Sequence, residues 1–250
     1  MKNVPYVELP LVVDNEPVVF GEYTDIYIRQ KFISKVYSIL WSMLLVTTIY
    51  IGICNQNKQV QTFLMSENAQ SLLYIDLFGL ITVTIMIVCC SGTIQKSPFL
   101  NWFSLLLFTV FETFLLGYVG IIYDTNTLLL GGLSTLFIFT GLSVYAIQTK
   151  YDYTMYGNIL IILFMTLILF SILLGFMDES FTLNILYSTC GSLLFSFYIV
   201  YDTQLIVGGE NRRIKYTEND YVLAAIGLYM DIINLFLFLL DLLQGGRNCE

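Results

Sequence analysis

The stretch GNILIILFMTLILFSILLGFM, residues 157–177, carries no charge over a length that can cross a bilayer as a helix. About 20 helical residues span a hydrocarbon layer of about 30 Å. The runs described here are continuous rather than alternating, which predicts helices and not the strands of a barrel. Six further apolar windows lie at 36–54, 71–90, 99–123, 128–148, 183–206 and 221–243. The expected fold is therefore an all-α integral membrane protein, a bundle of about seven transmembrane helices.

The composition supports a membrane protein and favours some classes of partner over others. Hydrophobic residues make up 57% of the 250 residues and charged residues only 12%, a balance that suits a bilayer better than water. The net charge of −8 argues against a nucleic-acid partner and favours cations. The chain has no His, which removes the commonest zinc ligand and the commonest proton switch. Proton sensing would therefore have to use carboxyl groups.

The apolar windows divide the chain into three regions. Residues 1–35 are expected to form a largely disordered tail, because they carry several prolines and no helical period. Residues 36–243 form the transmembrane domain, and 244–250 form a short C-terminal tail. The seventh window either crosses the membrane or turns back as a re-entrant hairpin, and the sequence leaves both alternatives open.

The distribution of basic residues predicts the orientation. If the N-terminal tail is cytosolic, the loops between the first six spans that face the other side carry only Lys58. By the positive-inside rule, this asymmetry places the N-terminus in the cytosol. The basic residues that would then be cytosolic are Arg29, Lys31, Lys35, Lys96, Lys150, Arg212, Arg213 and Lys215.

Four acidic side chains fall inside the apolar windows at least four residues from either end, and none of these windows contains Lys or Arg. The acids are Asp76, Glu112, Asp202 and Asp231. An acid at mid-membrane costs roughly 2.5–3.5 kcal/mol, which usually reflects a function. Burial favours the protonated form, two neighbouring acids can share one proton, and a bound cation favours the charged form. The interior therefore predicts a site for protons or cations.

Asp202 and Asp231 form the strongest candidate pair. Tyr198 lies one helical turn before Asp202, and Asn234 lies about one turn after Asp231, so each acid has a polar neighbour on its face. We expect Asp202 and Asp231 to sense protons and to act as Ca²⁺ ligands. Pore-lining or supporting candidates are Glu112, Asp76, Asn234 and Tyr198. Asp76 is interpreted equally well as a neutral acid that is hydrogen-bonded to another helix.

Two segments resemble the signature of the transmembrane Bax inhibitor motif family, in the branch of the Lifeguard and Golgi anti-apoptotic proteins. They are Tyr201-Asp202-Thr203-Gln204-Leu205 with Gly208-Gly209, and 221–226 running into Leu228-Tyr229-Met230-Asp231-Ile232-Ile233-Asn234. Residues 141–150 and Phe111-Glu112 also resemble that branch. The resemblance implies a seven-segment fold that lets Ca²⁺ leak from an internal store and protects cells from apoptosis. It also implies that protonation of Asp202 and Asp231 gates the leak.

The leading hypothesis is an anti-apoptotic, pH-sensitive Ca²⁺ leak channel of ER or Golgi membranes, with the plasma membrane as a further location. Its expected partners are the lipid bilayer, Ca²⁺ as permeant or transiently bound ion, and apoptosis-regulator proteins. We expect no tightly bound cofactor and no enzymatic activity.

Two alternatives remain. One is an adaptor without transport, which binds Bcl-2-type or death-receptor partners. The other is an intramembrane aspartyl protease, since two aspartates in consecutive spans can activate a water molecule. However, Asp231 lacks a Gly-x-Gly immediately before it, and no Pro-Ala-Leu triplet follows. These differences make the protease the weaker alternative.

Overall fold

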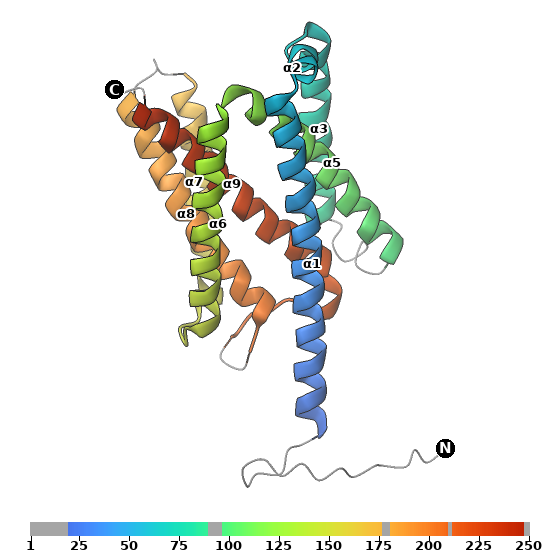
Figure 1. Cartoon of the computed structure of the whole chain (residues 1–250). Helices are drawn as coiled ribbons and strands as arrows, with labels where there is room; N and C mark the ends of the chain where they lie inside the picture. The colour runs from blue at the N-terminus through green and yellow to red at the C-terminus, as the bar shows by residue number, and fades with distance from the viewer. Residues whose placement is uncertain (1–19, 90–96, 177–180, 210–211, 248–250) are drawn as a thin grey trace.

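The chain folds into a bundle of long helices in the computed structural model, which describes residues 20–89, 97–176, 181–209 and 212–247 (Figure 1). The long helices are α1 (Phe20–Gln56), α3 (Glu67–Cys89), α5 (Pro98–Ile122), α6 (Thr125–Gln148), α7 (Gly157–Leu174), α8 (Phe181–Val207) and α9 (Tyr221–Arg247). Shorter elements are α2 (Lys58–Leu64), η1 (Tyr153–Tyr156) and η2 (Glu218–Asp220). The described ranges contain no strand, and seven helical spans are long and apolar enough to cross a membrane. The predicted all-α membrane bundle is confirmed.

The first helix starts earlier than its apolar window. α1 begins at Phe20, whereas the window begins at Val36, and the membrane-compatible span starts at Tyr27. Phe32 and Val36 are both buried in the core, so one face of the early turns packs against the bundle. Residues 20–35, which the sequence assigned to a disordered tail, are therefore helical. The rest of that predicted tail lies outside the described residues.

The last helix crosses the bundle without turning back. α9 is one continuous helix of 27 residues, which corresponds to a length of about 40 Å. α1 begins at one end of the bundle and α9 finishes at the other (Figure 1). Among the described residues, the re-entrant alternative for the seventh segment is therefore excluded. We call the end at which α1 and α9 begin and α6 and α8 finish the N-side.

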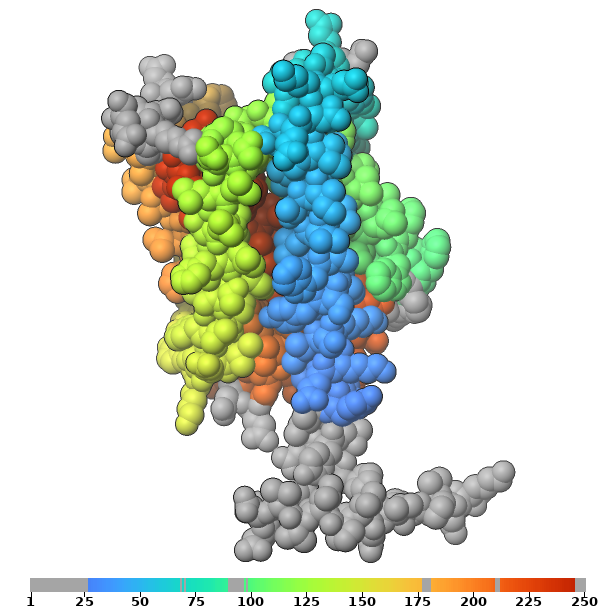
Figure 2. Space-filling view, viewed as in Figure 1, coloured from blue at the N-terminus to red at the C-terminus, as the bar shows by residue number. Residues whose placement is uncertain are grey.

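α9 is the central helix of the bundle. It has the largest buried share of the seven spans and packs against α8, α6, α1 and α5. Figure 2 shows α1 and α6 standing in front of α9, which is visible between them. α3 leans mainly on α5, and α7 mainly on α8, so both lie at the periphery. Polar side chains on α9 are thus positioned to meet side chains from several other helices inside the bundle.

Candidate functional site

Asp202 of α8 and Asp231 of α9 meet inside the bundle. The two side chains are only 7% and 5% exposed, and their carboxyl groups lie within hydrogen-bonding range of each other. Gly227 lies one turn before Asp231 on α9. A Cβ atom built on Gly227 would be 2.7 Å from Oδ2 of Asp202. The missing side chain of Gly227 therefore leaves the space into which the Asp202 carboxyl group reaches.

The pair can hold either a proton or a cation. Oδ2 of Asp231 is buried and has no hydrogen-bond donor among the described residues. Two carboxylates this close cannot both stay charged in a low-dielectric interior unless a positive ion lies between them. Within the described residues, no group of three or more Asp, Glu, Cys or His side chains is placed to hold a metal ion. The described part of the site thus offers two carboxyl groups to a cation.

The two residues after Asp202 fix the end of α8 to other helices. Gln204 is almost completely buried, and its Oε1 accepts a hydrogen bond of 2.8 Å from the Tyr153 backbone N–H. Its Nε2 donates to the carbonyl oxygens of Ala146 at 3.3 Å and Tyr151 at 3.0 Å. Thr203 is buried beside the hydroxyl group of Tyr37 on α1. Consecutive residues of α8 therefore reach α9, α1 and the segment after α6.

Arg29 of α1 caps the N-side end of α8. Its Nε donates to the carbonyl of Val207 at 3.0 Å, and its Nη2 donates to that of Leu205 at 2.6 Å. A helix leaves its last carbonyl groups unpaired, and a cation there also favours the helix dipole. Gly208 follows with φ of +65°, the left-handed conformation typical of a helix end. The apolar window alone does not reveal this role of Arg29, because α1 begins at Phe20, well before the window starts at Val36.

Arg212 caps the N-side end of α6 in the way that Arg29 caps α8. Its Nη2 donates to the carbonyl oxygens of Thr149 at 2.7 Å and Ala146 at 3.3 Å, and its Nη1 donates to Tyr151. The neighbouring Arg213 is exposed. One arginine of the basic cluster near residue 212 therefore holds the end of α6.

Asp76 and Glu112 form a second acidic group, apart from the aspartate pair. They are 7% and 4% exposed, on α3 and α5, and the charge of Asp76 acts on Glu112. Nearby, Thr47 of α1 bonds the hydroxyl of Tyr229 at 2.8 Å and that of Thr113 at 3.3 Å. Residues 229 and 231 are two positions apart, so they point to nearly opposite sides of α9. The four acids predicted from the sequence thus separate into two groups on either side of the central helix.

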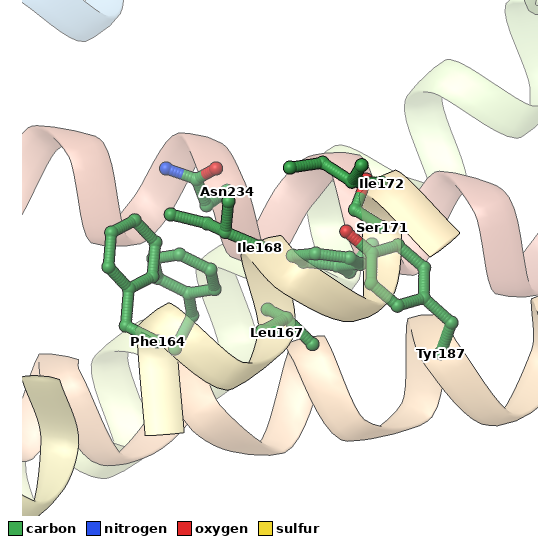
Figure 3. A pocket seen from close by; sticks show the side chains of 9 residues that line it. Phe164, Leu167, Ile168, Ser171, Ile172, Tyr187 and Asn234 are labelled. Atoms are coloured by element: carbon green, nitrogen blue, oxygen red, sulfur yellow. The ribbon is translucent and has the colours of Figure 1, made fainter. Parts of the chain in front are cut away.

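The two polar neighbours predicted for the pair behave differently. Tyr198 lies close enough to feel the charges of Asp231 and Asp202, and its ring packs against Phe164. Asn234 instead donates its amide to the Met230 carbonyl of its own helix at 2.8 Å. Figure 3 shows Asn234 at a cavity of about 270 Å³ between α7, α8 and α9. Asn234 therefore faces this mainly apolar cavity, and its amide nitrogen bonds the carbonyl of its own helix rather than Asp231.

The comparisons with known proteins place this arrangement in a family. A family model described as "Inhibitor of apoptosis-promoting Bax1", the Bax inhibitor family, matches residues 29–248. The chain belongs to the Bax inhibitor family. The matched range contains Arg29, both acidic groups and Gly227, so it includes every residue of the site described above. The prediction of the family from the last two motifs is confirmed.

Relatives of this Bax inhibitor family chain carry the names that the sequence suggested. Protein lifeguard 3 of Homo sapiens is 32% identical over 232 residues, which cover 91% of this chain and 72% of that protein. The Golgi anti-apoptotic protein of Vaccinia virus (strain Lister) is 33% identical over 223 residues, which cover 89% of each. The chain is therefore a multi-pass membrane protein of the anti-apoptotic Bax inhibitor and Lifeguard family.

Proposed function

We propose that this protein is a pH-sensitive, Ca²⁺-permeable leak channel of an intracellular store, and that Asp202 and Asp231 gate it. The observation that supports the proposal most is the meeting of two buried carboxyl groups from adjacent membrane spans, in the space that Gly227 leaves open. A cation is the partner that such a pair takes when both groups are charged. Ca²⁺, a hard cation that binds oxygen ligands, fits this chemistry.

The protonation of Asp202 and Asp231 decides whether the proposed ion path is closed or conducting. With one proton shared, the carboxyl groups of Asp202 and Asp231 hydrogen-bond to each other and hold α8 against α9. When that proton leaves, two negative charges face each other in a medium of low dielectric constant, so they repel each other and attract a cation. We therefore assign the closed state to the shared proton and the conducting state to the doubly charged pair.

The second acidic group supplies a further polar region along the bundle. Glu112 and Asp76 lie near the hydroxyl groups of Thr47, Thr113 and Tyr229, between α1, α3, α5 and α9. Carboxyl and hydroxyl oxygens are suitable transient ligands for Ca²⁺. We assign Glu112 and Asp76 to the lining of the ion path, whereas Asp202 and Asp231 carry the gate.

The basic residues at the N-side support an orientation in the membrane, and the name of a relative supports a location. Arg29, Lys31 and Lys35 lie on the N-terminal half of α1, and Arg212 lies at the same N-side. By the positive-inside rule we assign the N-side to the cytosol. The name of the viral relative, Golgi anti-apoptotic protein, supports a Golgi or ER membrane, and a plasma-membrane population is the alternative.

A measurement of store content tests the proposal. Cells that express the wild type are expected to hold less luminal Ca²⁺ than cells that express Asp231→Asn at equal protein level, because the variant cannot form the doubly charged state. Asp241→Asn is a matched control, since Asp241 lies on the same helix but its carboxyl group accepts a hydrogen bond from Tyr123, away from the pair. Equal luminal Ca²⁺ in cells with the wild type, the variant and no added protein would refute the leak.

The same cells separate the two rival functions. If protection from apoptosis persists in Asp202→Asn/Asp231→Asn, the protein is an adaptor that binds apoptosis regulators without transport. If a model transmembrane substrate is cleaved by the wild type and not by either Asp→Ala variant, it is an aspartyl protease. The leak channel predicts loss of protection with the double variant and no cleavage.

A further inference from the structure

Tyr216, which lies between α8 and α9 in the chain, contacts the end of α8 and lies close to the aspartate pair. Beyond the left-handed Gly208, the backbone N–H of Tyr216 donates to the Leu205 carbonyl of α8 at 3.1 Å. The Tyr216 hydroxyl lies 3.8 Å from the position of a Cβ atom on Gly227, and Oδ2 of Asp202 lies 2.7 Å from that same position. The phenol of Tyr216 therefore reaches the pair from the N-side.

The ring of Tyr216 packs tightly beside the aspartate pair, and its hydroxyl group stays protonated there. Its ring packs against the apolar core around α9. Burial raises the pKa of Tyr216 well above its ordinary value, and the negative charges of Asp202 and Asp231 act in the same direction. An uncharged aromatic ring thus stands between the pair and the N-side of the bundle.

Arg29 holds this ring in place through the backbone. Its Nη1 donates to the Tyr216 carbonyl at 2.6 Å, while its Nε and Nη2 bind the last carbonyls of α8. One guanidinium group therefore ties together α1, the end of α8 and the Tyr216 segment. These hydrogen bonds are charge-assisted, and all three end on backbone carbonyl groups, so the contact depends on the position of the backbone around Tyr216.

We propose that Tyr216 is a stopper that closes the N-side approach to Asp202 and Asp231, and that Arg29 is its anchor. Water and cations reach the pair from the N-side when Arg29 releases the Tyr216 carbonyl and the ring withdraws. This assignment concerns access to the pair, and only its Ca²⁺ readout rests on the proposed leak function.

Labelling of a cysteine at the pair tests access without any need for transport. The reporter is Asp202→Cys in a protein whose five native cysteines are replaced by serine, treated with a membrane-impermeant thiol reagent from the N-side. We expect Tyr216→Ala and Arg29→Ala to increase the labelling rate several-fold, and Tyr216→Phe to leave it near that of the reporter. Tyr156→Ala and Arg213→Ala, which change exposed residues of the same end, serve as controls and should not increase it.

The labelling and the Ca²⁺ readouts can fail separately. Equal labelling with and without Tyr216→Ala would overturn the stopper, whatever the protein transports. With the native Asp202 present, Tyr216→Ala should also raise Ca²⁺ efflux from proteoliposomes several-fold. Faster labelling together with no Ca²⁺ efflux above that of protein-free liposomes, for the wild type and for Tyr216→Ala, would support the stopper and refute the proposed leak function.

Discussion

Oδ2 of Asp202 occupies the space beside Gly227, 2.7 Å from the point at which a side chain would begin. A methyl group at position 227 would push the carboxyl group of Asp202 away from α9 and from Asp231. The pair depends on this glycine, because any larger residue competes for the volume that the carboxyl group fills.

Gly227→Ala is therefore expected to disturb gating more than folding. Alanine favours a helix over glycine by about 1 kcal/mol, which offsets part of the steric cost of moving Asp202. We expect a melting temperature close to that of the wild type, together with a shifted pH dependence of Ca²⁺ efflux. Gly132→Ala is the matched control, because a Cβ atom there meets nothing within 4 Å. An unchanged pH profile in Gly227→Ala would show that the pair tolerates displacement.

Gln204→Leu should destabilise the fold without altering the pH response. The substitution leaves the Tyr153 N–H without its side-chain acceptor, whereas the carbonyls of Ala146 and Tyr151 keep their hydrogen bonds from Arg212. An unpaired buried N–H costs about 1–3 kcal/mol, so thermal unfolding in detergent should show a clear loss. The exposed Gln148 on α6 provides the control, and Gln148→Leu should leave the melting temperature unchanged. Equal melting temperatures for the two variants would contradict the anchoring role of Gln204.

Asp76→Asn separates a pore role from a packing role. Oδ2 of Asp76 is buried without a hydrogen-bond partner among the described residues, so removal of the charge should keep stability or raise it by up to about 1 kcal/mol. As a lining residue, Asp76 should still be required for full Ca²⁺ efflux, and efflux should fall several-fold. Efflux equal to that of the wild type would instead assign Asp76 to a neutral packing role.

Asp152→Asn should leave the pH dependence of efflux between about pH 5 and 8 unchanged. Burial raises the pKa of Asp152, but hydrogen bonds from Thr154 and Arg213 and the charge of Arg212 outweigh it and hold the pKa below its ordinary value. The stability that Asp152 contributes is present above its unfolded pKa and is lost only as the pH falls through the lower folded pKa. A shift of the efflux profile in this variant would show that the loop after α6, rather than the pair, senses protons.

The spans and the acidic pair could be predicted from the sequence because both depend on local composition. Seven apolar runs and two aspartates in adjacent spans are visible without knowledge of contacts. The start of α1 was missed because averaged hydropathy overlooks turns with only one apolar face, such as that of Phe32. Arg29 was consequently assigned to a tail.

Contacts that depend on distant segments could not be predicted. Helical spacing correctly put Asn234 near Asp231 on α9, but it could not show that a cavity beside α7 lies opposite Asn234. Tyr216 reaches the pair only because the chain turns back after Gly208, a return that no periodic pattern encodes. Glu112 and Asp76 belong to a separate group because α9 stands between them and the pair. For Asn234, Glu112 and Asp76, the residue's own helix fixes its face, whereas the tertiary fold decides what that face meets.

The most direct test of the proposed gate is Ca²⁺ efflux from proteoliposomes of purified protein, measured from about pH 5 to 8, for the wild type, Asp202→Asn and Asp231→Asn. Efflux through the wild type should rise with pH as the shared proton leaves, whereas both variants should show low efflux that does not change with pH. Efflux that rises with pH equally in all three proteins would contradict gating by Asp202 and Asp231.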